Sequence, residues 1–154
     1  MSGGKDLELK VPPVAVMLVL ACLMGLSTGL GPRLLWPHLR DIGSGLIFGG
    51  ISVGILGIVS FRRAQTTVDP RFPRRTTALV TSGIYRITRN PMYLGMLLAL
   101  AGLACCLGHL LPFLAAPSFV IFINRWQIVP EERALAQLFP TSFNFYRAQV
   151  RRWL

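Results

Sequence analysis

Acidic residues are scarce in this sequence of 154 residues, which contains six Asp and Glu but sixteen Lys and Arg. Charged residues of both signs make up only 14% of the chain, whereas 53% of it is apolar. Residues 11–32, 42–61 and 90–124 contain no charged residue at all. A soluble domain of this size is rarely so apolar, and the composition therefore argues against one.

Cysteine is scarce as well. Cys22, Cys105 and Cys106 lie inside the charge-free stretches, with no paired spacing outside them and no Cys/His pattern typical of a metal site. Free cysteines in apolar segments behave as small apolar residues. The sequence therefore predicts neither a disulfide framework nor a bound metal.

The charge-free stretches have the lengths of membrane spans. A bilayer core needs about 20 apolar residues per helix, so the first two stretches predict one span each. The third is too long for one span and predicts two short helices that fold back near Gly108 and His109. We predict a single all-α domain, residues 1–154, that is a polytopic membrane protein with about four transmembrane helices. The expected spans are 13–30, 42–61, 91–107 and 109–126.

Basic residues are distributed unevenly between these spans. Two precede the first span, seven lie between Arg62 and Arg89, and five lie from Arg125 onward, whereas only Arg33 and Arg40 lie in the first connection. Fourteen are thus on one side and two on the other. Because basic loops stay in the cytoplasm, both termini and the active site are expected there. The net charge of +10 then reflects topology and membrane lipids, and no nucleic acid partner is needed.

Glycines punctuate the second expected span, at positions 45, 49, 50, 54 and 57. Small residues at spacings of three and four allow another helix to approach closely in lipid. We expect helix packing here, with a lipid tail in the same groove as the alternative. The pattern is compatible with packing within one chain or between chains, so it leaves the oligomeric state open.

Two helix starts are predicted at the cytoplasmic face. Asn90-Pro91 begins the third span, and Pro130-Glu131-Glu132 begins a helix after the fourth. Because a two-span hairpin returns the chain to the side it left, these segments are expected to be neighbours. Helix starts offer unpaired N–H groups to a carboxylate or phosphate, while glutamates accept from hydroxyl and amino groups. Together they suit a zwitterionic ligand.

An amphipathic helical tail is predicted after the fourth span. Apolar residues recur there at spacings of three and four, and the arginines lie off this stripe, as in helices that rest on a membrane surface. Pro140 is expected to divide the tail into two helices. The apolar stripe consists of Leu135, Leu138, Phe139, Phe143, Tyr146, Val150 and Trp153.

The chain from about Thr66 to Leu154 resembles the superfamily of isoprenylcysteine carboxyl methyltransferases and phospholipid methyltransferases. The resemblance rests on residues 83–95, GIYRITRNPMYLG, and residues 131–135, EERAL. It implies an integral membrane enzyme that binds S-adenosylmethionine through regions of about 66–95 and 127–154. A lipophilic substrate is expected to enter from the bilayer. The family often has His at the position of Asn90, with Asn as a common variant.

The resemblance also implies roles for individual residues. Gly95 is expected to let the cofactor or a neighbouring helix approach; one of the two glutamates holds the cofactor and the other orients Arg89. Arg89 and Arg133 alternatively recognise an anionic group on the substrate. The candidates for catalysis are Glu131, Glu132, Arg89 and Arg133. The candidates for cofactor binding are Tyr85, Asn90, Pro91, Tyr93, Gly95, Glu131 and Glu132.

The expected reaction is direct in-line transfer of a methyl group to a lipophilic or membrane-resident carboxylate, amine or thiol. Such a transfer depends mainly on alignment of the reactants. One alternative is a membrane reductase that uses a nicotinamide cofactor, because sterol reductases have a related C-terminal region. The other is a non-catalytic membrane scaffold in which both motifs only begin helices.

Overall fold

The computed structural model of this chain describes residues 8–64 and 78–154. These residues form helices joined by turns, with no β-strand among them, so the predicted all-α class is confirmed. Residues 66–77 of the expected cofactor-binding region lie outside the described residues. The α-helices are α1 (Pro13–Leu26), α2 (Leu39–Arg63), α3 (Pro91–Leu107), α4 (Ala115–Ile123), α5 (Val129–Leu138) and α6 (Pro140–Gln149).

Prolines and a glycine mark several helix ends. Pro13 and Pro91 occupy the first positions of α1 and α3, where a missing N–H costs nothing and the fixed φ favours the helix. Gly108 ends α3 in a left-handed conformation with φ of 64°, and its N–H donates to the carbonyl of Ala104 at 3.1 Å. Glycine adopts this conformation without a steric penalty. The turn expected at Gly108 therefore has a local cause.

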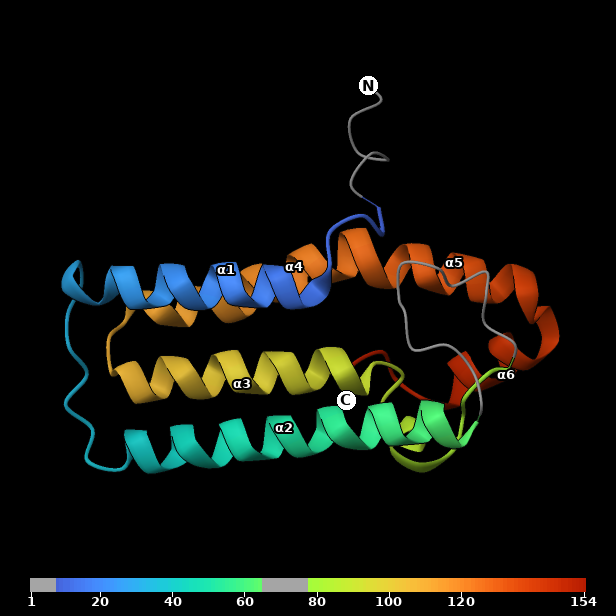
Figure 1. Cartoon of the computed structure of the whole chain (residues 1–154), viewed down its shortest axis with the longest axis horizontal. Coiled ribbons are helices and arrows are strands. Elements are labelled where there is room, and N and C mark those ends of the chain that lie inside the picture. Colours follow the sequence, from blue (N-terminus) through green and yellow to red (C-terminus); the bar gives the residue numbers. More distant parts are fainter. Residues whose placement is uncertain (1–7, 65–77) are drawn as a thin grey trace, which may run out of the picture.

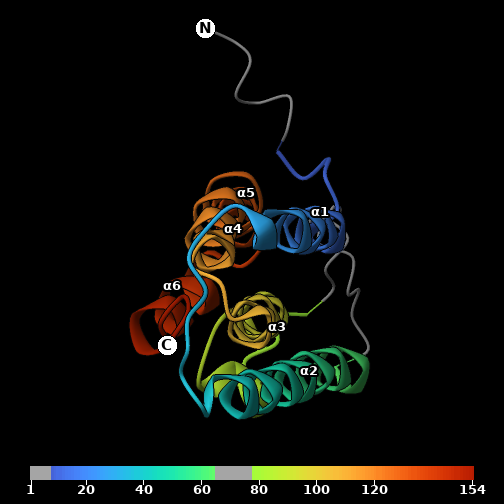
Figure 2. The ribbon, with the colours of Figure 1, turned by 90° about the vertical axis from the view of Figure 1, so that its left-hand side faces the viewer.

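Helix α3 lies at the centre of the bundle. It contacts α2 on one side and α1 and α4 on the other, as the end-on view shows (Figure 2). Within the described ranges, α2 alone is both long and apolar enough to cross a membrane, while α1 and α3 are shorter apolar helices. The expected spans 13–30, 42–61, 91–107 and 109–126 overlap α1, α2, α3 and α4, respectively.

Two connections meet at one end of the bundle. The N–H of Leu34 donates to the carbonyl of Gly108 at 2.8 Å, and the N–H of Leu110 donates to the carbonyl of Pro32 at 3.2 Å. The α1–α2 connection therefore lies against the α3–α4 turn. The start of α3 and helices α5 and α6 lie at the opposite end (Figure 1).

Glycines allow the backbones of α2 and α3 to touch. Gly43, Gly50 and Gly57 are buried and lie seven residues apart, on one face of α2. A Cβ atom on Gly50 would lie 2.5 Å from the carbonyl oxygen of Gly95, and one on Gly43 would lie 2.6 Å from that of Gly102. These glycines therefore pack within the chain, against α3.

The tail forms two helices that pack onto the rest of the chain. The helix breaks at Phe139, and Pro140 begins α6, as predicted. Five residues of the apolar stripe join one buried cluster with Phe61, Val80 and Tyr85: Leu135, Phe139, Phe143, Tyr146 and Val150. Most of the stripe thus faces the protein itself, against the connection before α3.

Replacement of Gly50 by alanine is expected to destabilise the fold. The added methyl group meets backbone atoms of α3, which cannot move aside as a side chain can, and overpacking of this kind costs about 1–3 kcal/mol. Gly45→Ala is the matched control, because a Cβ there meets nothing within 4 Å and alanine favours helix over glycine. Thermal unfolding of both variants in detergent would measure the difference, and equal midpoints would contradict the close contact.

Candidate functional site

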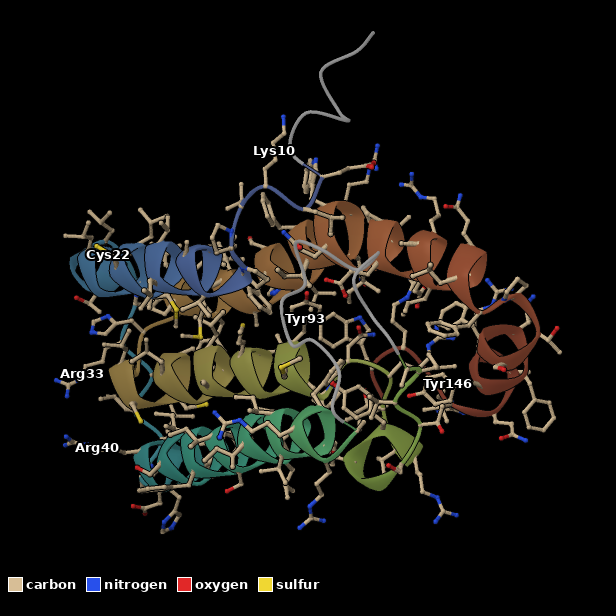
Figure 3. All side chains as sticks on the ribbon, turned by 45° about the vertical axis from the view of Figure 1, so that its right-hand side comes forward. Lys10, Cys22, Arg33, Arg40, Tyr93 and Tyr146 are labelled. Carbon is tan, nitrogen blue, oxygen red and sulfur yellow. The ribbon has the colours of Figure 1, made fainter. Side chains whose placement is uncertain are left out.

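The candidate residues gather where α3 begins and α5 follows the C-terminal end of α4. Tyr93, in the first turn of α3, and Tyr146, on α6, lie toward this end, whereas Arg33 and Arg40 lie at the far end (Figure 3). Between α4 and α5 the chain makes one wide π-helical turn, η5 (Asn124–Ile128). The residues from 115 to 138 thus continue from α4 through η5 into α5.

A hydrogen bond joins the two expected helix starts. The hydroxyl of Tyr93 donates to Oε1 of Glu131 at 2.5 Å, and Tyr93 is 5% exposed. Pro91 begins α3 as predicted. The second expected helix start is not found, because the helix continues from η5 into α5 and Pro130 is the second residue of α5. The structure therefore brings together segments that are 38 residues apart in sequence.

The Glu131 carboxyl is held without a cation in the described part of the chain. Burial raises its pKa from 4.5 to about 8, because the charged form loses its hydration. The hydrogen bond from Tyr93 offsets part of this rise, and the negative charge of Glu132 adds to it. A carboxyl in this state gains from a ligand that brings a positive charge or hydroxyl donors.

The Glu132 carboxylate binds two arginines instead. Oε1 lies 2.9 Å from the guanidinium of Arg89, and Oε2 lies 2.6 Å from that of Arg152. Arg152 also donates through Nε to Oε1 at 3.2 Å, which makes its contact bidentate. The side chains of Glu132 and Arg89 are only 14% and 10% exposed, so this pair is largely shielded from water, whereas the side chain of Arg152 is 37% exposed. Between the two glutamates, it is Glu132 that contacts Arg89.

Burial lowers the pKa of Arg89, while the carboxylate of Glu132 opposes that effect. Its guanidinium also donates to the carbonyl of Arg147 at 3.3 Å. Its Nε is buried and has no acceptor among the described residues. One donor of Arg89 is therefore left without a partner in the described part of the structure.

The C-terminal residues contact the segment before α3, within the region of about 127–154 that the resemblance implies, although Thr88, Arg151 and Arg152 are not individual candidates. The N–H of Arg89 donates to the carbonyl of Arg151 at 3.0 Å. The side chain of Asn90 donates through Nδ2 to the carbonyl of Arg152 at 2.9 Å, and the buried hydroxyl of Thr88 donates to the same carbonyl at 3.3 Å. Arginine and threonine at these positions have no local pattern that would identify them.

Asn90 leaves the start of α3 uncapped. Because its amide binds the C-terminal backbone, no side chain caps this helix, and the first intrahelical bond runs from the N–H of Leu94 to the carbonyl of Asn90. The N–H groups of Met92 and Tyr93 therefore precede the helical ladder, as at every helix start. They are donors suited to a carboxylate.

Tyr85 lies in the wall beside this cluster. Its carbonyl accepts a hydrogen bond from the hydroxyl of Tyr146 at 2.7 Å, and its ring packs edge-on against Phe61 with centroids 5.3 Å apart. Burial raises the pKa of both tyrosine hydroxyls well above the ordinary value, so both stay protonated near neutral pH. Tyr85 thereby anchors α6 to the segment before α3.

Two other candidates lie apart from these contacts. Gly95 faces α2, where its backbone meets Gly50 and Gly54, so the partner that it admits is a helix. The Arg133 side chain is 54% exposed and pairs with Glu8 at 3.1 Å. Of the two arginine candidates, Arg89 alone contacts either glutamate within the described residues.

Glu132→Gln is expected to lower the free energy of unfolding by about 3 kcal/mol, because it leaves two arginines near each other without their shared carboxylate. Asp41→Asn is the matched control, since Asp41 is exposed and, among the described residues, pairs with His38 alone, at the other end of the bundle. The control is expected to cost under about 1 kcal/mol. Chemical or thermal unfolding in detergent measures both, and equal losses would contradict the role of Glu132.

One comparison with known proteins identifies a family. Residues 39–142 match the phospholipid methyltransferase family, and this range includes Pro91, Tyr93 and Glu131. A protein of Haemophilus influenzae described as "Uncharacterized protein" is 40% identical over 63 residues, which are 41% of this chain and all of that protein. No solved structure matches the chain. The match covers more than half of the sequence, and the chain belongs to the phospholipid methyltransferase family.

Proposed function

We propose that this protein is a membrane methyltransferase that binds S-adenosylmethionine and methylates a lipophilic acceptor. The observation that carries the proposal is the Glu131 carboxyl, which is bound by the Tyr93 hydroxyl, lacks a cation among the described residues and lies beside the uncapped start of α3. Membership of the family supports methyl transfer. The site chemistry supports a zwitterionic ligand.

The residues at this end fit the polar groups of the cofactor. An α-carboxylate suits the free N–H groups at the start of α3 and the unpartnered Nε of Arg89. An amino group or ribose hydroxyls suit Glu131. We assign Glu131 to the cofactor and Glu132 to the arginine cluster. The cofactor site also includes Asn90, Pro91 and Tyr93. Tyr85 and Gly95 have a structural role instead, because Tyr85 contacts α6 and Gly95 packs against α2.

S-adenosylmethionine supplies a methyl group already activated on a sulfonium. The protein residues then have to align the acceptor and exclude water, which are the main contributions available in such a transfer. A carboxylate or thiolate acceptor needs no further activation, whereas an ammonium must first lose a proton. Because Glu132 is held by two arginines, Glu131 is the acidic side chain free to accept that proton. We infer direct transfer without a covalent intermediate.

We further propose that α1, α2, α3 and the α4–η5 helix cross the membrane, with the site at the cytoplasmic face and the tail beside the inner leaflet. Apolar side chains on the outer surfaces of α1 and α2 are exposed, among them Leu18, Leu23, Phe48, Ile51 and Ile55. Exposed apolar surface on this scale favours contact with lipid. Arg33 and Arg40 point outward at the end away from the site (Figure 3). In the proposed topology this end, which carries the fewer basic residues, faces away from the cytoplasm.

Binding of S-adenosylmethionine to the purified, folded protein tests the proposal. Glu131→Gln is expected to weaken binding by about 10- to 100-fold, the range for a lost charged hydrogen bond, and Asn90→Ala is expected to weaken it by loss of local order. Asp41→Asn serves as the control with unchanged affinity. Absence of binding to the wild type would overturn the proposal; binding of NADPH instead would favour a reductase, and binding of neither would favour a scaffold.

The pH dependence of binding provides a second test. The proposal requires ionised Glu131, and its pKa in the folded protein is about 8. Affinity is therefore expected to rise by up to about tenfold per pH unit below that value and to level off above it. Glu131→Gln should remove this dependence. A pH-independent wild-type affinity between about pH 6 and 9, measured by calorimetry with a cofactor analogue stable in that range, would contradict the assignment.

The same carboxyl predicts how the stability of the free protein changes with pH. Between 4.5 and about 8 the folded protein holds a proton on Glu131 that the unfolded chain releases. The stability contributed by this group is therefore full below about pH 4.5, falls as pH rises and is lost above about 8. The unfolding midpoint of Glu131→Gln, compared with wild type across this range, should lack that decline. Parallel curves for the two proteins would show that Glu131 does not titrate as described.

A further inference from the structure

The segment Glu8–Val11 crosses the outside of η5, the wide turn that leads into α5. The N–H of Leu9 donates to the carbonyl of Trp126 at 3.0 Å. The side chain of Gln127 donates through Nε2 to the carbonyl of Val11 at 2.6 Å. Two backbone groups of this segment thus pair with two successive residues of η5, more than one hundred positions away in sequence.

The wide turn needs partners from outside the helix. Pro130 has no N–H to donate to the carbonyl of Trp126, which lies four residues before it. The N–H of Leu9 donates to that carbonyl instead. A buried carbonyl without a donor would be costly, so the N-terminal segment replaces a hydrogen bond that the sequence of the helix itself removes.

The wide turn also decides where Glu131 points. An α-helix advances by about 100° per residue. A π-helical turn holds one extra residue, so every side chain after it points in a different direction from the one it would have in an unbroken α-helix. Val129 donates to the carbonyl of Asn124, five residues back, which defines the wide turn. Glu131 follows directly, and its bond to Tyr93 depends on this facing. Turns of this kind are frequent at functional sites.

Gln127 is the central residue of this arrangement. It is 0% exposed, and it precedes Glu131 by four residues, about one turn. Within the described residues its Nε2 has the carbonyl of Val11 as acceptor, while its Oε1 has no donor. A buried amide that bonds to a distant segment fixes the helix far more strictly than an apolar side chain of the same size.

Glu8 and Leu9 hold the segment in place. The Glu8 carboxylate, whose side chain is 18% exposed, lies 3.1 Å from Arg133 and 3.5 Å from Arg125. Arg125 lies in η5, and Arg133 lies beyond it in α5. Leu9 has a φ of 60°, a left-handed conformation that a residue with a branched side chain rarely adopts without compensating contacts. The conformation of the segment is therefore set by what it binds.

We propose that Glu8–Val11 is a positioning strap for the candidate cofactor site, and that Gln127 is the positioning residue through which it fixes Glu131 against Tyr93. The inference rests on the proposed function for its effect on cofactor binding. The hydrogen bonds of the strap with η5 do not depend on that function. The strap also explains why Arg133 pairs with Glu8 and not with Glu131 or Glu132.

The first test measures the strap without any ligand. Gln127→Met keeps the length of the side chain but removes its hydrogen bond, and Glu8→Gln is a milder change at a partly exposed position. Backbone hydrogen exchange at Val129, Glu131 and Glu132 is expected to become about fivefold faster in both variants, as for one lost hydrogen bond. Gln137→Met, on the exposed face of α5, is the matched control. Exchange equal to the control would overturn the strap.

The second test asks whether Gln127 acts through Glu131. In the wild-type background Gln127→Met is expected to weaken S-adenosylmethionine binding by about fivefold, and in the Glu131→Gln background it should add less than twofold. The same loss in both backgrounds would overturn the link to Glu131, because a general loss of structure does not depend on that carboxyl. A wild type without cofactor binding would overturn the proposed function, while the exchange measurement would still decide the strap.

Discussion

The hydrogen bond between Tyr93 and Glu131 is the contact on which the rest of the site depends. It requires that α3 begin at Pro91, that the hairpin return the chain to the same end, and that η5 turn α5 toward α3. Each of these conditions comes from a different part of the sequence. Burial disfavours the charge of this carboxyl, and the hydrogen bond from Tyr93 offsets only part of that cost.

Adjacent glutamates divide two tasks because neighbouring residues on a helix point about 100° apart. Glu131 faces the start of α3, while Glu132 faces two arginines that come from the segment before α3 and from the C-terminal end. Glu132 therefore joins three segments that have no sequence proximity. This cluster holds the three segments together, and both of its arginines pair with Glu132 and not with Glu131. Because Arg152 contributes to this cluster, the C-terminal residues belong to the candidate site.

Local chemistry made the start of α3 predictable, and topology made its proximity to Glu131 predictable. Pro91 and Gly108 act through their own backbone geometry, so the sequence identifies them directly. Pro130 predicts a helix start as well, but the helix continues there from η5 into α5. The contacts of Arg152, Glu8 and Gln127 depend on the packing of distant segments, and η5 has no local signal that distinguishes it from an ordinary helical turn. The spacing of apolar residues predicts the apolar stripe of the tail, but only the fold shows that Phe61 and Tyr85 pack against much of it.

The start of α3 has no side-chain cap, at some cost to the helix. Asparagine is among the best residues for capping a helix, and a missing cap costs about 1 kcal/mol. Asn90 nevertheless uses its amide to bind the carbonyl of Arg152, which leaves the first N–H groups of α3 without a side-chain acceptor. The buried Nε of Arg89 is unpartnered beside them among the described residues. Unfilled donors and a carboxyl without a cation among the described residues are complementary to the two charges of an amino acid, and the proposed binding of S-adenosylmethionine depends on this complementarity.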